Sequence, residues 1–195
     1  MIGIIDYGMG NLGSVMNACR FLELDAKIVT RKEEMDACRA VVLPGVGAFG
    51  DCMAHLVEHD FVQTIEKWIA SGKPLMGICL GLQALFESSE ESPGVPGLGI
   101  FGGTVKRFDL PKELKVPQIG WNRINEVQPD CPMLMGSTMV RSSTLCIPIM
   151  SVRLTSRLWR DGRGTASTTA PVSGRTTFSP LSFILKNRRR PDCGC

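Results

Sequence analysis

Histidine is scarce in this chain, and its absence from most of the sequence limits the chemistry available. The only two histidines in 195 residues are His55 and His59. The eight cysteines form no Cys-x-x-Cys pair, and both histidines fall on a predicted helix away from any cysteine cluster. Structural zinc ligands usually come in such pairs. The sequence therefore indicates no metal site, and it gives no sign of a cofactor.

Long apolar runs and targeting signals are also missing. No hydrophobic stretch approaches the roughly 20 residues of a membrane span, and the start, MIGIIDYG, has no basic region or cleavage site. The cysteine spacings are irregular, unlike those of secreted disulfide scaffolds. With 44% hydrophobic residues and a mean hydropathy of +0.08, the chain is expected to be one soluble domain in the cytoplasm, with no membrane partner.

Acidic residues nearly disappear after Met135. From there to the end the chain has ten Lys and Arg residues, opposed only by Asp161 and Asp192. A basic tail of this kind often binds nucleic acid. We expect no nucleic-acid partner here, because the reading frame of the tail offers a different explanation.

The segment Lys73–Glu87, KPLMGICLGLQALFE, carries the strongest chemical signal. It reads as a buried strand over Pro74–Ile78, a sharp turn at Cys79, and an amphipathic helix. Gly77 and Gly81 flank the cysteine, which is the spacing of a nucleophile elbow, where a side chain beyond glycine would clash. A thiol at a helix N-terminus is favoured as a thiolate. A lone cysteine in an apolar run can equally be a small core residue. The helix is expected to bury Leu82, Leu85 and Phe86.

The first strand, Ile2–Tyr7, leads into a glycine-rich turn and a helix. The turn, Gly8–Gly13, has the form of a dinucleotide fingerprint. The second strand, Ala26–Thr30, continues into Arg31-Lys32, with no acid for a ribose hydroxyl. Dinucleotide binding stays an alternative to a plain strand-to-helix turn. The helix is expected to bury Leu12, Val15, Met16, Cys19 and Leu22.

A third strand, Ala40–Leu43, runs into the loop Pro44–Gly47. Such a loop presents backbone N–H groups, and an oxyanion hole needs two donors, for which Val46 and Leu80 are the candidates. A helical stretch over about 51–71 then returns to the elbow strand. Alternating strands and helices with short links predict an α/β fold, a mostly parallel sheet with helices on both faces and sites at the carboxyl ends of the strands.

Farther along, Gly103–Asp109 is predicted to be an exposed strand. The segment Val116–Asn122, VPQIGWN, is apolar and carries an aromatic residue. It suits a partner surface, although ordinary packing onto the core is the alternative.

Four segments, DYGMGN, PGVGAFG, GICLGLQALFESSEE and VPQIGWN, together resemble the glutaminase subunits of imidazole glycerol phosphate synthases, a family of class I glutamine amidotransferases. The resemblance extends from Met1 to about Leu134. It implies a three-layer, flavodoxin-like fold. It also implies a cyclase subunit as partner in a heterodimer of histidine biosynthesis, to which the glutaminase passes ammonia.

The resemblance also implies roles for single residues. Cys79 attacks the glutamine side-chain amide, releasing ammonia and leaving a glutamyl thioester. The oxyanion is bound by the backbone of the Gly45–Gly47 segment and by the Leu80 N–H group. Gln83 and Glu91 match positions that hold the amino-acid part of glutamine. The surface facing the cyclase matches Asn11, Pro117, Gly120 and Trp121.

The family supplies a base for its cysteine from a C-terminal FHPEK segment, and this chain has no histidine after His59. The tail can be translated back into codons and read in another frame, in which each new codon is the third base of one codon joined to the first two bases of the next. Arg175–Lys186 can then be read as DNVFATQFHPEK, and Gly136–Met150 as IDDGAQFYFVHSYYV. Both strings look like the missing family segments, in the right order and spacing.

The hypothesis is therefore a reading-frame shift close to Met135. Residues 1–135 form the amidotransferase domain, and 136–195 is an out-of-frame tail, expected to be disordered or irregular, so that the C-terminal part of the fold is incomplete. Without the His–Glu pair, glutaminase activity should be lost or trace. A non-catalytic subunit that only binds the cyclase is the first alternative, and a dinucleotide-binding protein the second.

Overall fold

The computed structural model describes residues 1–107, 118–123, 142–147, 150–154, 165–166 and 183–186. Its centre is a sheet with the strand order β10-β11-β4-β3-β1-β2. In this sheet β10 is Thr165–Ala166 and β11 is Phe183–Lys186. The four strands of the N-terminal half are mutually parallel, and β11 pairs with β4 in the antiparallel sense. These four are short, apolar segments, as is typical of strands covered on both faces. They are β1 (Ile2–Ile5), β2 (Ala26–Val29), β3 (Ala40–Leu43) and β4 (Leu75–Gly77).

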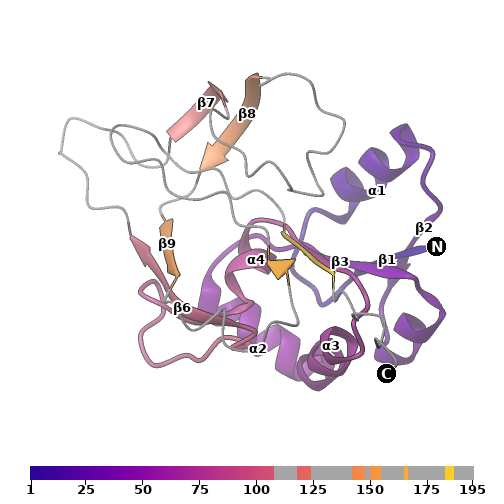
Figure 1. Cartoon of the computed structure of the whole chain (residues 1–195), viewed down its shortest axis with the longest axis horizontal. Coiled ribbons are helices and arrows are strands. Elements are labelled where there is room, and N and C mark those ends of the chain that lie inside the picture. Colours follow the sequence, from indigo (N-terminus) through magenta and orange to yellow (C-terminus); the bar gives the residue numbers. More distant parts are fainter. Residues whose placement is uncertain (108–117, 124–141, 148–149, 155–164, 167–182, 187–195) are drawn as a thin grey trace, which may run out of the picture.

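Helices cover both faces of this sheet, as predicted. α1 (Leu12–Phe21) lies on one side and α2 (Phe49–Glu58) and α3 (Phe61–Ala70) lie on the other (Figure 1). The main core forms between the sheet and helices α2 and α3. Its largest fully buried side chains include Tyr7, Leu43, Phe49, Leu56, Phe61 and Ile65.

α1 packs less completely than its sequence pattern predicts. Of its expected apolar face only Cys19 is fully buried, and Leu22 is 62% exposed. Leu22 is the C-cap residue, one position beyond the last helical residue, so it no longer follows the helical face.

The single helical stretch expected over 51–71 is two helices, so that prediction was wrong in this detail. Asp60, between them, adopts a left-handed conformation with φ +59°. Aspartate tolerates this region better than most residues. Its carboxylate also contacts Lys32 Nζ, in the helical turn η1 (Lys32–Ala37), at 3.0 Å.

The helix after Cys79 is also shorter than predicted. α4 (Leu80–Gln83) is one turn long, and Phe86 begins strand β5 (Phe86–Ser89). β5 pairs in parallel with β6 (Phe101–Arg107), and the Phe86 and Phe101 rings pack with their centroids 5.3 Å apart. This distant aromatic contact favours the strand. It also buries Phe101 and Val105, so β6 is not the exposed strand that was expected.

The segment after residue 107 contributes further strands. β7 (Gln118–Arg123) pairs with β8 (Ser142–Ile147), and β9 (Met150–Leu154) pairs with β6. β10 (Thr165–Ala166) and β11 (Phe183–Lys186) extend the central sheet. We expected 136–195 to be disordered or irregular. Within that range these four short strands are described, and the rest lies outside the described residues.

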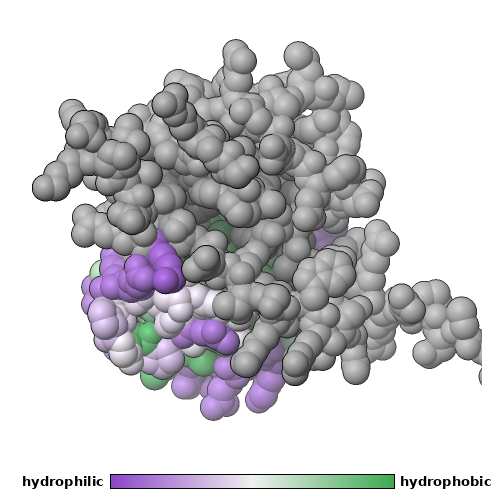
Figure 2. All heavy atoms as spheres, turned by 60° about the vertical axis from the view of Figure 1, so that its left-hand side comes forward, coloured by the Kyte–Doolittle hydropathy of each residue, from purple (hydrophilic) through white to green (hydrophobic). Residues whose placement is uncertain are grey.

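On the face in Figure 2, the coloured residues are mostly hydrophilic, with small separate hydrophobic areas. Among the described helices, none has the length and apolar character that a membrane crossing requires.

Candidate active site

Cys79 occupies the turn between β4 and α4 in a strained backbone conformation. Its φ is +53° and its ψ is −116°. A non-glycine residue rarely adopts a positive φ, and such residues cluster at functional sites. The side chain is half-buried. This is the sharp strand-to-helix turn that the glycine–cysteine spacing predicts.

The flanking glycines are required by close packing of the backbone. A Cβ on Gly77 would lie 2.7 Å from the Leu82 Cα, and a Cβ on Gly81 would collide with the carbonyl oxygen of Leu43. The Ile78 N–H group donates to that same carbonyl at 2.9 Å. The turn is thereby held against the end of β3.

The loop after β3, Pro44–Gly47, lies directly on this turn. A Cβ on Gly45 would come within 2.9 Å of the Leu80 Cβ, so only glycine permits the approach. Leu80 is the first residue of α4, and its N–H group has no partner within the helix. Val46 is 51% exposed on the loop. The segments that carry both predicted oxyanion donors are therefore in contact.

Tyr7 supports this loop through its buried hydroxyl group, a role that the sequence analysis missed. Its hydroxyl donates to the Pro44 carbonyl oxygen at 2.8 Å and lies 3.3 Å from the Cys52 Sγ. Burial raises the pKa of Tyr7 well above its usual range, and Cys52 raises it further. Burial also raises the pKa of the Cys52 thiol to about 11. Both groups are therefore neutral at ordinary pH. The sequence held one sign of this supporting role: Tyr7 is the only tyrosine, and it lies at the carboxyl end of the predicted first strand.

The residues expected to hold glutamine lie near this region in different environments. Gln83, the last residue of α4, is only 8% exposed. Glu91 is exposed, and its Oε2 accepts a hydrogen bond from the Phe49 N–H group at 3.2 Å. Because Ser92 Oγ accepts from the next N–H group, that of Gly50, at 2.9 Å, this loop caps the N-terminus of α2. Glutamine binding by Gln83 and Glu91 stays a prediction.

The residues expected to face a partner are dispersed along the chain. Asn11 is exposed and caps α1, its Oδ1 accepting from the Ser14 N–H group at 3.0 Å. Gly120 and Trp121 belong to β7, in register with residues of β8. Pro117 lies outside the described residues. Their part in an interface stays a prediction.

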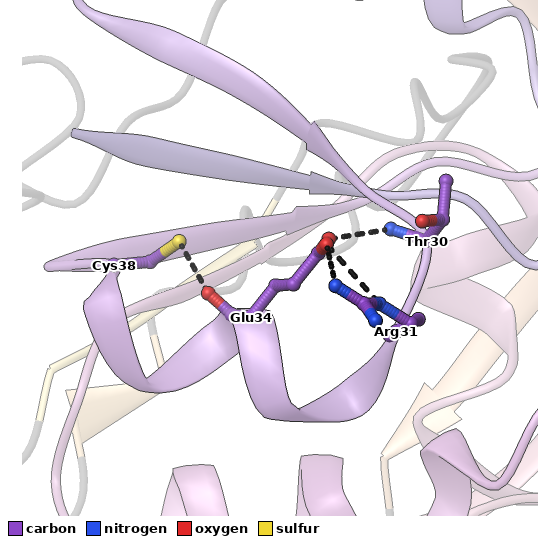
Figure 3. A network of polar contacts seen from close by, with 4 residues as sticks. All are labelled: Thr30, Arg31, Glu34 and Cys38. Atoms are coloured by element: carbon purple, nitrogen blue, oxygen red, sulfur yellow. Dashed lines mark hydrogen bonds and ion pairs between the residues drawn. The ribbon is translucent and has the colours of Figure 1, made fainter.

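The Gly8–Gly13 turn gives little support to dinucleotide binding. A Cβ on Gly13 would meet only Asn11 Oδ1, at 3.8 Å, so this glycine does not serve close packing of helix and sheet. The nearest acid to the end of β2 is also occupied. Figure 3 shows Glu34 accepting from the Thr30 N–H group at 3.1 Å and from Arg31. These contacts, the Thr30 hydrogen bond first, lower the pKa of Glu34.

Both histidines of the chain lie at the end of α2. The His55 and His59 rings stack with centroids 6.3 Å apart, and His55 Nδ1 contacts the Tyr7 carbonyl oxygen at 3.2 Å. These contacts occupy His55 away from the elbow turn. We assign no catalytic base to Cys79.

Comparison with known proteins gives a consistent picture. The family model "Glutamine amidotransferase class-I" matches residues 3–136. "Imidazole glycerol phosphate synthase subunit HisH" of Cyanothece sp. is 52% identical over 136 residues, covering 68% of this chain and 63% of that relative. The protein of the same name from Prochlorococcus marinus strain MIT 9211 is 36% identical over 200 residues, covering 95% of this chain and 93% of the relative.

Solved structures agree on the fold. A glutamine amidotransferase crystal structure matches with a TM-score of 0.53 at 22% identity, covering 63% of this chain and 62% of that one. The structure of PurLQS from Thermotoga maritima matches with a TM-score of 0.51 at 17% identity, covering 80% and 70%. The strong sequence match to the Cyanothece and Rhodopirellula baltica relatives spans only 63% and 61% of their lengths.

Proposed function

Because the chain belongs to the class I glutamine amidotransferase family, we propose that it derives from the glutaminase subunit of an imidazole glycerol phosphate synthase. The observation that carries this proposal is the strained turn at Cys79, held by glycines against the Pro44–Gly47 loop. The names of the curated relatives support the choice among amidotransferases. Glutamine is then the substrate, a cyclase subunit in the cytoplasm is the partner, and no nucleic acid or membrane takes part.

The proposed reaction begins with attack of the Cys79 thiolate on the amide carbon of the glutamine side chain. The C–S bond forms, and the carbonyl electron pair moves onto oxygen. N–H groups of Val46 and Leu80 stabilise this oxyanion, each donor being worth about 3 kcal/mol. The intermediate collapses by breaking the C–N bond, and a proton must reach the leaving nitrogen to give ammonia. Water then cleaves the glutamyl thioester to glutamate.

Two of these steps need a base and an acid, and among the described residues we assign neither. The thiol must lose a proton, and the leaving nitrogen must gain one. We propose that a reading-frame shift close to Met135 removed the group that does both. The match to the family model stops at residue 136, one position after the inferred shift, which supports this account.

β11 pairs with β4, the strand that leads to Cys79. Phe183 stands opposite Gly77, and Ile184 stands opposite Met76. The codons of Phe183 and Ile184 are the pair that supplies a histidine codon in the other frame. We propose that the frame-corrected chain also forms a strand at this position, which would place its histidine beside the elbow strand.

One experiment tests function and frame together. Two proteins are made, the chain as written and a version with the frame corrected at codon 135. Each is assayed for ammonia release from glutamine with a cyclase subunit from a relative. We expect the corrected protein to turn over, and the written chain to be at least about a thousandfold slower, because a triad nucleophile without its base loses most of its rate.

Cys79→Ala in the corrected protein is the control, and it should abolish turnover. Ordinary turnover by the written chain would refute the frame shift. A corrected protein that binds the cyclase but never hydrolyses glutamine would favour the non-catalytic alternative. Labelling of Cys79 by a glutamine-like electrophile separates these cases further, because a catalytic thiol reacts far faster than a free cysteine.

A further inference from the structure

Three potential metal-binding side chains converge at the end of α2. His55, Glu58 and His59 are spaced i, i+3 and i+4, which places them on one face of a helix. One ligand atom from each lies within 4.8 Å of the others. Ligand atoms around a tetrahedral zinc ion lie about 3.3 Å apart, given metal–ligand distances near 2.0–2.1 Å. Small rotations of the exposed Glu58 and His59 side chains would therefore bring all three onto one ion.

His55 is already oriented for this role. Its Nδ1 lies 3.2 Å from the carbonyl oxygen of Tyr7. A carbonyl oxygen can only accept, so Nδ1 is the donor in this contact and Nε2 is the nitrogen left to bind a metal ion. Metal-binding histidines are commonly fixed in this way, with the second ring nitrogen donating to a backbone carbonyl.

The chain after β1 passes close to both imidazoles. Gly8 has a φ of +84°, and a Cβ there would lie 3.0 Å from His55 Nδ1 and 3.9 Å from His59 Nε2. The neighbouring Asp60 carboxylate is paired with Lys32, so it does not compete. Two imidazoles and one carboxylate suit a divalent ion, with water completing the coordination.

We propose that His55, Glu58 and His59 bind a divalent transition-metal ion, with zinc as the best fit. The expectation of no metal site depended on the lack of cysteine companions for the histidines, whereas here the third ligand is a carboxylate. The site depends on local geometry alone and is independent of the glutaminase proposal. A bound ion would tie together the side chains at the end of α2, beside the chain at Gly8. That chain continues to Gly10, where a Cβ would touch the Pro44 ring at 3.0 Å.

The test is titration of the full chain with Co²⁺, followed by displacement with Zn²⁺. Spectra distinguish imidazole and carboxylate ligands from the eight cysteines, because thiolates add strong charge-transfer bands in the near ultraviolet. We expect binding without those bands. We also expect His59→Ala to weaken zinc binding at least tenfold and Glu58→Gln to weaken it measurably. Both residues are exposed, so neither change should disturb folding.

Glu66→Gln, at an exposed position of α3, is the matched control, and its affinity should equal that of the parent chain. Thiolate bands throughout the titration would overturn the proposal. Equal affinity of the parent and His59→Ala, or no binding below millimolar zinc, would overturn it as well.

Discussion

At the scale of single residues, the site depends on three glycines. Gly45, Gly77 and Gly81 let the loop after β3, the strand β4 and the first turn of α4 approach one another. Cys79 sits among them with a positive φ that costs about 1–3 kcal/mol. The surrounding contacts must hold that strain, so changes at these glycines should affect chemistry before they affect the overall fold.

Gly45→Ala tests this in the frame-corrected protein. The added Cβ would press on Leu80 and displace the loop that carries the Val46 N–H group. We expect kcat for glutamine hydrolysis to fall by about a hundredfold, the usual loss when one oxyanion donor is misplaced.

Gly13→Ala is the matched control, because its Cβ would meet nothing nearer than 3.8 Å. It should leave kcat unchanged and stabilise α1 by up to about 1 kcal/mol. If both variants kept full activity, the Pro44–Gly47 loop would have no part in the oxyanion hole.

At the scale of elements, short helices depend on their ends. α1 has a single fully buried residue, Cys19, so its N-cap carries a large share of its stability. Asn11 supplies that cap through its hydrogen bond with the Ser14 N–H group. The same residue is also expected at the cyclase surface, and the two roles can be measured separately.

Asn11→Ala should lower the free energy of unfolding by about 1 kcal/mol, the usual cost of losing an asparagine cap. Asn17→Ala, at an exposed position within the same helix, should not destabilise the protein, because alanine is the better helix former. Urea denaturation of the two variants makes the comparison. Equal stabilities would contradict the capping role.

At the scale of the whole molecule, two of the ionisable groups buried in the main core contact each other. Tyr7 and Cys52 contact each other beneath the Pro44 loop, between β1 and α2. Burial raises the pKa of the Cys52 thiol from its ordinary value of 9.0 to about 11. Between these values the unfolded chain releases a proton that the folded chain retains. The contribution of this thiol to stability is therefore complete below pH 9 and is lost as the pH rises through the folded pKa.

The alkaline loss of stability from Cys52 should reach about 3 kcal/mol, because each pH unit between the unfolded and folded pKa values contributes about 1.4 kcal/mol. Denaturant unfolding of the parent chain and of Cys52→Ala at pH 8, 9, 10 and 11 would check it. We expect a flatter pH profile for the variant, although its stability at pH 8 should be lower because a buried side chain is truncated. Parallel profiles would mean that the thiol ionises without unfolding the core.

Features that depend on neighbouring residues could be predicted from the sequence alone. Apolar runs located β3 to the residue and the start of β1, although β1 ends at Ile5 and not at Tyr7. The Gly-x-Cys-x-Gly spacing predicted the turn at Cys79, because sterics allow few other conformations there. The absence of histidine after His59 and the basic composition after Met135 could also be seen without a structure, since they depend only on which residues are present.

Features that depend on distant contacts required the folded chain. Asp60, at the break, pairs with Lys32, and Phe86, at the start of β5, packs on Phe101. Neither partner lies in the local window that a periodicity covers. The support of the Pro44 loop by Tyr7 spans 37 residues of sequence. The orientation of His55 likewise needs the Tyr7 carbonyl, 48 residues away. Such pairs come into contact only when the sheet forms, so no local sequence pattern could predict them.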